Sequence, residues 1–244
     1  MKNTILNALI TLLLFLAILF FILNCLKNNQ SEPIGNNSQS IITIQHESDS
    51  QQIHTSSSWN LILVNPWNPL PEDFSVNLTE LRNGHYIDER AYPDLQAMMD
   101  ASRAEGLSPI ICSSYRTITK QEDLYENKVS YYLSQDYSLE ESETEAAKWV
   151  ARPGTSEHHT GLALDIVSLN YQLLDEEQEN TPEQQWLMHN SYKYGFILRY
   201  PNDKSEITGI HYEPWHYRYV GKEIAKEIYE QGICLEEYLE NLQK

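Results

Sequence analysis

The chain has 244 residues, enough for one or two domains with a sizeable core. It carries 35 acidic against 17 basic residues, a formal net charge of -18, which argues against long-range attraction to nucleic acid or to an anionic membrane surface. The three cysteines, Cys25, Cys112 and Cys234, lack metal-ligand spacing, so we expect neither a disulfide framework nor a cysteine zinc site.

The N-terminal residues 1–27 predict an uncleaved membrane anchor. From Ile5 to Leu26 an uncharged apolar run of about 22 residues is long enough to cross a hydrocarbon core of ~30 Å as a helix. A cleavable signal peptide would have a shorter apolar region ending in small residues. Lipidation at Cys25 is the alternative, although Ile22-Leu23-Asn24 lacks the small residue expected before a lipidated cysteine.

Residues 28–58 predict a flexible stalk, because a segment dominated by Asn, Gln, Ser and charged residues buries too little apolar surface to offset its ordering entropy. The soluble domain is therefore expected over residues 59–244.

Helix and strand signals alternate in this domain. Trp59–Val64 reads as a short strand, and Pro93 begins a helix that ends at Gly106 and buries Leu95, Met98 and Met99. Pro109–Ser113 reads as a buried strand.

Three further helices are predicted over 119–133, 138–150 and 181–195, the first two from capping-box patterns and the third from a Thr-Pro start and a glycine stop. Phe196–Tyr200 returns as a strand. The expected fold class is α+β, with a small, mostly antiparallel sheet flanked by helices.

The stretch SEHHTGLALD, residues 156–165, places a lone acid within an apolar run. If Gly161–Val167 is a strand, Asp165 shares a face with small neighbours while Leu162, Leu164 and Ile166 point to the other face. A buried carboxylate is unfavourable without a positive partner, and a metal ion is the strongest such partner. His158 can fold back toward that face, whereas His159 would point away.

A second histidine and acid occur in EPWHYRYV, residues 213–220. Pro214 favours an extended chain, on which Glu213 and His216 face opposite ways unless a loop or bulge intervenes. Three nitrogen and oxygen ligands with one unligated carboxylate are typical of a hydrolytic zinc site. We therefore assign His158, Asp165 and His216 to one zinc ion and Glu213 to the general base; individually, each histidine could instead be a hydrogen-bonded structural residue.

The two stretches resemble the S-x-H-x-x-G-x-A-x-D and E-x-W-H signatures of zinc D-alanyl-D-alanine peptidases. Together with SSYRT, residues 113–117, they are similar to VanY-type D-alanyl-D-alanine carboxypeptidases, which share the lysostaphin, D-Ala-D-Ala peptidase and hedgehog metallopeptidase fold. The resemblance covers Trp59 to Leu239 and includes the anchor-and-stalk layout of membrane-bound members.

The resemblance implies the same three zinc ligands, with Glu213 activating water and Arg116 stabilising the oxyanion. It implies substrate-binding roles for Ser114, Tyr115, Gln121, Ser156 and Trp215. His159 stands where the family commonly has Gln, and His211 precedes the second signature; either is an alternative ligand in principle.

The implied reaction removes the C-terminal D-Ala from peptidoglycan stem peptides that end in D-Ala-D-Ala, which in relatives lowers the supply of the glycopeptide antibiotic target. We expect a monomeric, single-pass cell-membrane protein with its catalytic domain on the extracellular side and no nucleic acid partner. The alternatives are an L,D-carboxypeptidase that trims tetrapeptide stems, a non-catalytic cell-wall binding module and a structural domain without metal.

Overall fold

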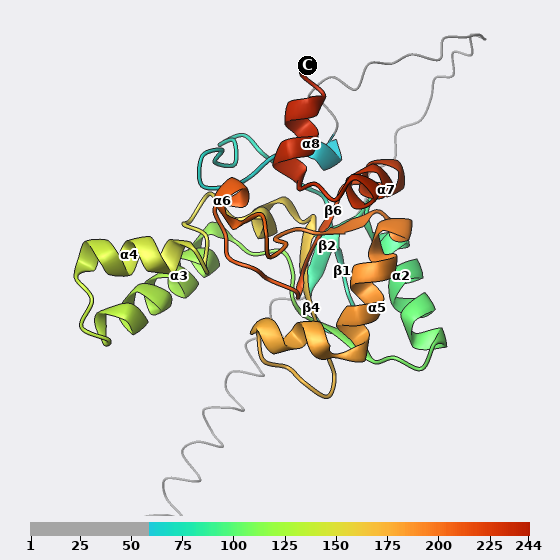
Figure 1. The fold of residues 1–244 in the computed structure, drawn as a ribbon, viewed down its shortest axis with the longest axis horizontal. Helices are drawn as coiled ribbons and strands as arrows, with labels where there is room; N and C mark the ends of the chain where they lie inside the picture. The colour runs from blue at the N-terminus through green and yellow to red at the C-terminus, as the bar shows by residue number, and fades with distance from the viewer. Residues whose placement is uncertain (1–58) are drawn as a thin grey trace, which may run out of the picture. The chain divides into compact units, whose positions relative to one another are not determined.

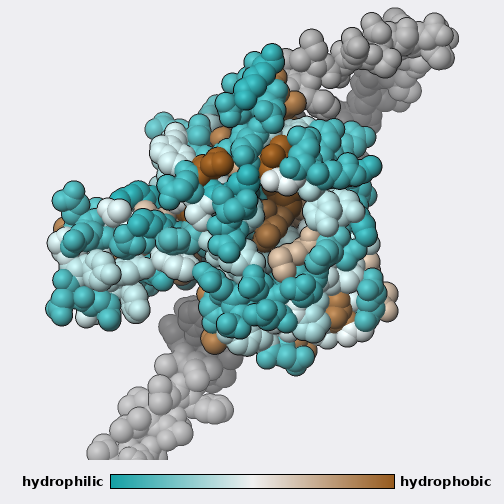
Figure 2. All heavy atoms as spheres, viewed as in Figure 1, coloured by the Kyte–Doolittle hydropathy of each residue, from teal (hydrophilic) through white to brown (hydrophobic). Residues whose placement is uncertain are grey.

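The computed structural model describes residues 59–244, so the predicted anchor and stalk lie outside the described residues. Within 59–244, no helix is long and apolar enough to cross a membrane. The face of the domain shown in Figure 2 is mainly hydrophilic, and hydrophobic residues show in the recesses between elements.

The centre of the domain is a four-stranded antiparallel sheet in the order β3-β4-β6-β5. Its strands are β3 (Pro109–Ser113), β4 (Ala163–Ser168), β5 (Phe196–Leu198) and β6 (His216–Tyr219). A separate antiparallel pair is formed by β1 (Leu78–Glu80) and β2 (Tyr86–Asp88). The predicted α+β class with an antiparallel sheet is confirmed.

The helices fall into groups around the sheet (Figure 1). They are α2 (Tyr92–Ala104), α3 (Ile118–Leu133), α4 (Leu139–Ala147), α5 (Pro182–Asn190), α6 (Ser205–Thr208), α7 (Lys222–Gln231) and α8 (Leu235–Asn241). Short 3₁₀ helices occupy Trp59–Leu61, Glu157–Thr160, Glu176–Asn180 and Ser191–Tyr194. In Figure 1 α3 and α4 form a hairpin that projects to one side of the sheet.

Helices α2 and α5 cover one face of the sheet and form the main core with it. The alternation of β4 and of the residue before it brings Leu164, Ile166 and Leu162 to this core, as the sequence predicts. The helix side contributes Leu95, Met98, Met99 and Leu187, all buried. The opposite face of β4 carries Asp165 and is therefore left for polar side chains.

Two smaller clusters support the rest of the domain. Helices α7 and α8 pack against Leu61, Ile197 and Val220. The hairpin has its own cluster of Tyr125, Val129 and Ala146, so its stability depends in part on contacts between α3 and α4.

Three local predictions are wrong in detail. Trp59–Leu61 is a 3₁₀ helix and no strand follows it before Val64. The N-cap of α3 is Thr117, whose hydroxyl accepts from the Lys120 amide, and not Thr119. The predicted third helix stops at Asn190 and continues as a 3₁₀ turn to Gly195, where φ is 85°. The capping box at Ser138 and Glu141 is confirmed.

Candidate active site

The sheet register brings the predicted metal ligands together. Asp165 lies directly opposite Ser113 on β3 and His216 on β6. Directly opposed residues of antiparallel strands point to the same face. The Asp165 and His216 side chains therefore meet on the face that α2 and α5 leave uncovered.

His158 reaches the same place from the 3₁₀ turn that precedes β4. The turn ends at Gly161, which has φ 72° and accepts a hydrogen bond from the Asp88 amide at 2.8 Å. A Cβ atom on Gly161 would lie 2.9 Å from the Leu78 side chain, so this position requires glycine for both conformation and space. The tight turn folds His158 back over Asp165.

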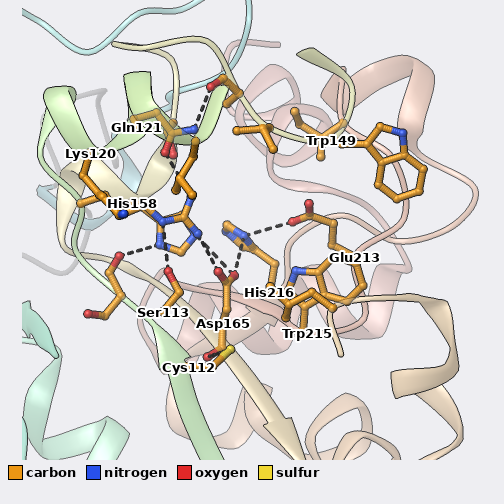
Figure 3. A pocket seen from close by; sticks show the side chains of 18 of the residues that line it. Cys112, Ser113, Lys120, Gln121, Trp149, His158, Asp165, Glu213, Trp215 and His216 are labelled. Atoms are coloured by element: carbon orange, nitrogen blue, oxygen red, sulfur yellow. Dashed lines mark hydrogen bonds and ion pairs between the residues drawn. The ribbon is translucent and has the colours of Figure 1, made fainter. Parts of the chain in front are cut away.

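A second turn brings Glu213 beside His216. The His216 amide donates to the Glu213 carbonyl at 3.2 Å, and β6 begins only at His216. The Glu213 carboxylate therefore lies 3.3 Å from His216 Nδ1. Figure 3 marks this contact with a dashed line. The bend that the sequence analysis required is present.

Within the described residues, the side chains close enough to hold a metal are those of His158, Asp165 and His216, whose ligand atoms all lie within 4.8 Å of one another. Asp165 Oδ1 is 3.4 Å from His158 Nε2 and 3.3 Å from His216 Nδ1. Ligands about 2.0–2.1 Å from a tetrahedral zinc ion are separated by about 3.3 Å. Two of the three distances between ligand atoms thus match the separation expected around a tetrahedral zinc ion.

One unpaired buried oxygen fits the binding of a cation by this group. Asp165 Oδ1 is buried and has no hydrogen-bond partner among the described residues. Such atoms are rare in folded proteins because desolvation is uncompensated. A zinc ion bound by the three side chains would satisfy this oxygen, so the residues fit the metal.

The two histidines present different ring nitrogens to the site. His158 Nδ1 donates to the Ser114 carbonyl at 2.7 Å, which leaves the lone pair of Nε2 for a metal. His216 instead presents Nδ1 toward Asp165 and Glu213, and its Nε2 faces Glu157 at 3.6 Å. In Figure 3 both rings point toward Asp165.

The protonation states follow from burial and charge. Burial, and next the Arg116 charge, lower the pKa of His158 to about 4, so this ring is neutral at pH 7. Burial disfavours the charged form of His216, but the nearby carboxylates of Asp165, Glu157 and Glu213 outweigh it and raise the pKa to about 10. Zinc binding must therefore release a proton from His216. Burial raises the pKa of Glu213, as suits a group that both accepts and returns a proton.

Arg116 points its guanidinium into the site. Its Nη2 donates to Asp165 Oδ2 at 2.7 Å and lies 2.9 Å from His158 Nε2. Ser113 Oγ and Gln121 Oε1 accept from its other nitrogens at 3.0 and 3.1 Å. Because zinc needs the lone pair of His158 Nε2, the guanidinium must move away from that nitrogen when the metal binds.

The predicted substrate-binding residues have different surroundings. A cleft of about 590 Å³ is lined by all five, together with the zinc-site residues, Arg116 and Glu213. Ser156 is buried and its hydroxyl makes no hydrogen bond within the described residues, whereas Tyr115 is partly exposed. Ser114 and Gln121 are buried, and their polar atoms already contact the protein. Trp215 is buried at the cleft wall.

His159 and His211 lie outside the metal group. His159 Nδ1 contacts the Arg116 carbonyl at 2.8 Å, and its Nε2 accepts from the Gly154 amide. The His211 ring packs against Trp149 with 4.6 Å between centroids.

Three buried charged residues behind His216 were not predicted to belong to the site: Glu157, Arg199 and Arg218. The signal was present, since Arg199 and Arg218 each interrupt an otherwise apolar strand pattern and Glu157 lies inside the first motif.

Comparison with known proteins agrees with this geometry. The VanY family, described as D-alanyl-D-alanine carboxypeptidase, matches residues 84–222. A D-alanyl-D-alanine carboxypeptidase of Enterococcus faecalis is 48% identical over 199 residues, which cover 82% of this chain and 70% of the relative. One from Enterococcus faecium is 33% identical and covers 88% of this chain and 68% of the relative.

Solved structures show the same fold. A zinc complex of a mutant vancomycin resistance D,D-pentapeptidase VanY aligns with a TM-score of 0.69 at 50% identity, covering 75% of this chain and 99% of that one. VanYB in complex with D-alanine-D-alanine gives 0.70 at 50% identity, with 75% and 98% covered. The L,D-carboxypeptidase LdcB gives 0.60 at 40% identity, with 75% and 86% covered.

The fold and the site define a zinc metallo-carboxypeptidase. The chain belongs to the VanY family of D-alanyl-D-alanine carboxypeptidases. The predicted family, enzyme class and zinc cofactor are confirmed; the roles of the individual site residues stay predictions.

Proposed function

We propose that the protein removes the C-terminal D-alanine from peptidoglycan stem peptides ending in D-Ala-D-Ala. The observation that carries the proposal is that Arg116 contacts His158 and Asp165 while Glu213 contacts His216, with all five residues lining one cleft. Family membership supports this substrate class.

The roles follow from the contacts. A zinc ion held by the three ligands would act as a Lewis acid and would lower the pKa of a water molecule to about 7. The buried Glu213 carboxylate takes a proton from the attacking water and returns it to the leaving amine. Arg116, aimed by Ser113 and Gln121, donates to the oxygen of the scissile carbonyl as negative charge develops on it.

The terminal portion of the substrate requires polar contacts in the same cleft. The unpaired Ser156 hydroxyl supplies one. Lys128 lines the cleft as well and has no acidic partner within ion-pair distance among the described residues, so its charge is available to a substrate carboxylate.

The test is hydrolysis by purified residues 59–244 of two stem peptides, a pentapeptide ending in D-Ala-D-Ala and a tetrapeptide ending in a single D-Ala, with and without chelator. We expect release of one D-Ala from the pentapeptide, loss of the activity with chelator and recovery with zinc. Mass spectrometry identifies the released residue.

An L,D-carboxypeptidase is the second candidate, favoured by the 40% identity to LdcB. It predicts cleavage of the tetrapeptide and poor cleavage of the pentapeptide in the same assay. Cleavage of neither peptide by a zinc-loaded domain would support a non-catalytic binding module.

The proposed location is the extracellular side of the cell membrane, supported by the apolar run before residue 27 and by the location of the proposed substrate. Protease added to intact protoplasts should degrade the domain if it faces outward. Protection from that protease would contradict the location without affecting the enzymatic proposal.

A further inference from the structure

Glu157 is a fully buried carboxylate next to a zinc ligand in the chain, yet it points away from the metal group. Its Oε1 accepts from Arg199 Nε at 2.8 Å and from Arg218 Nη1 at 2.6 Å. Its other oxygen, Oε2, has no hydrogen-bond partner among the described residues.

The atom facing this unpaired oxygen is also unpaired. His216 Nε2 is buried, has no hydrogen-bond partner among the described residues and lies 3.6 Å from Glu157 Oε2. A buried donor and a buried acceptor that face each other just beyond hydrogen-bond distance need only a small shift to pair. The His216 ring thus lies between the metal group, on its Nδ1 side, and Glu157, on its Nε2 side.

The carboxylate is held rigidly in this place. Arg199 also makes a two-pronged ion pair with Glu236 of α8, at 2.9 and 2.7 Å. Arg218 donates to the backbone carbonyls of Asn60 and Ile62 at 3.0 and 2.8 Å. Two arginines and two glutamates balance in charge, and their hydrogen bonds tie together β5, β6, α8 and the start of the domain.

We propose that Glu157 is a positioning residue for the zinc ligand His216. It accepts the Nε2 proton, which places the lone pair of the ring on Nδ1, toward the metal, and fixes the orientation of the ring. Carboxylates that accept from metal-bound histidines typically change metal affinity by 10–100-fold when mutated. The inference rests on the zinc-dependent function proposed above and adds a residue that does not contact substrate.

Glu157→Gln is an informative substitution because of what surrounds the side chain. Arg199 and Arg218 are donors, so the amide oxygen will face them and the amide NH₂ will face His216 Nε2. An NH₂ group there favours the tautomer with a lone pair on Nε2 and a proton on Nδ1, which opposes metal binding.

Glu236→Gln is the matched control. It also removes one carboxylate from the same buried network, but Glu236 contacts Arg199 and not His216. Zinc affinity measured by chelator competition should fall about 10–100-fold in Glu157→Gln and stay within about 3-fold of wild type in Glu236→Gln. Equal affinity in Glu157→Gln and wild type, or equal losses in the two variants, would overturn the proposal.

A measurement on the wild-type protein keeps the proposal testable if Glu157→Gln does not fold. With ¹¹³Cd in place of zinc and ¹⁵N-labelled histidines, we expect metal coupling to His216 Nδ1 and a slowly exchanging proton on His216 Nε2. Metal coupling to Nε2 of His216 would refute the assignment.

The outcome separates this inference from the proposed function. If the wild-type protein cleaves stem peptides but the two variants bind zinc equally well, only the positioning role fails. If the affinities differ as expected but no peptide is cleaved, the proposed function fails and the positioning role stands.

Discussion

Arg116 connects the ligands to the reaction, because one guanidinium contacts Asp165, His158, Ser113 and Gln121. Ser113 and Gln121 hold its Nε and Nη1, and only the Nη2 contact with His158 has to be given up when a metal binds. Gln121, predicted to bind substrate, makes both of its hydrogen bonds to the protein, to Arg116 and the Ala151 carbonyl. Its contacts favour a role in orienting Arg116.

Replacement of Arg116 by alanine should lower kcat by roughly 10² to 10³ while zinc stays bound. Lysine at this position should recover little of the loss, since an ammonium cannot reproduce the planar fork that Ser113 and Gln121 hold. Steady-state kinetics and metal analysis of both variants provide the check. Wild-type turnover by Arg116→Ala would exclude an oxyanion role.

Replacement of Glu213 by glutamine should lower kcat by about 10² to 10⁴, the usual contribution of a positioned proton-transfer group, with one zinc per chain retained. The amide preserves size and leaves the three ligands unchanged. Metal content by mass spectrometry and kcat on the pentapeptide decide the outcome; loss of the zinc together with the activity would make Glu213 a ligand.

The grouping of the three proposed ligands could be predicted from the sequence because spacing and strand alternation are local properties. His158, Asp165 and His216 come together as expected. The partners of Glu157 could not be predicted in this way, since Arg199 and Arg218 lie 42 and 61 residues away from it in sequence. Only the sheet register, with Ile197 opposite Arg218, brings them to one face.

At the level of elements, the turn before β4 determines whether the site forms. Its last residue, Gly161, pairs through its carbonyl with Asp88, the last residue of β2, which fixes the β1–β2 pair against the turn. Strands and helices with strong periodicity were predicted with nearly correct bounds, as β3 and α2 show. Trp59–Val64 was not, because an apolar run that packs against α7 and α8 has the same composition as a buried strand.

Gly161→Ala should destabilise the domain by about 1–3 kcal/mol, since alanine disfavours a positive φ and its Cβ would contact Leu78 and the Asp88 amide. For a domain of this size that corresponds to a fall in Tm of about 2–4 °C per kcal/mol. Gly84→Ala is a matched control, because Gly84 also has a positive φ, of 77°, but no atom within 4 Å of the added Cβ. Equal losses in the two variants would show that space at Gly161 is unimportant.

At the scale of the whole molecule, the first residues of the domain stabilise elements that lie far from them in the sequence. The Asn60 side chain donates to the Val220 carbonyl, and the Asn60 and Ile62 carbonyls accept from Arg218. Leu61 joins the core formed by α7 and α8. The start of the domain is therefore joined to β6 and to the core of α7 and α8 through residues 59–62.

A fragment of residues 66–244 should accordingly be less stable than one of residues 59–244, because it leaves the Arg218 guanidinium buried with two carbonyl partners missing. We expect a fall in Tm of several degrees and weaker zinc binding, measured by thermal unfolding with and without added zinc. Identical melting of the two fragments would show that residues 59–65 do not stabilise the domain.

The α3–α4 hairpin has a consequence for evolution and for engineering. It supplies the cleft residues Lys120, Leu124 and Lys128, but none of the metal-holding residues, and it packs around a hydrophobic cluster of its own. Two of its cleft-facing residues are tied to the chemistry: Gln121 is hydrogen-bonded to Arg116, and the Lys128 charge interacts with Glu213. The other cleft-facing positions of the hairpin make no hydrogen bond or ion pair with the proposed catalytic residues in the described part of the chain. Exchanging this hairpin among relatives should therefore change which peptides the cleft prefers, while the metal-holding residues stay the same.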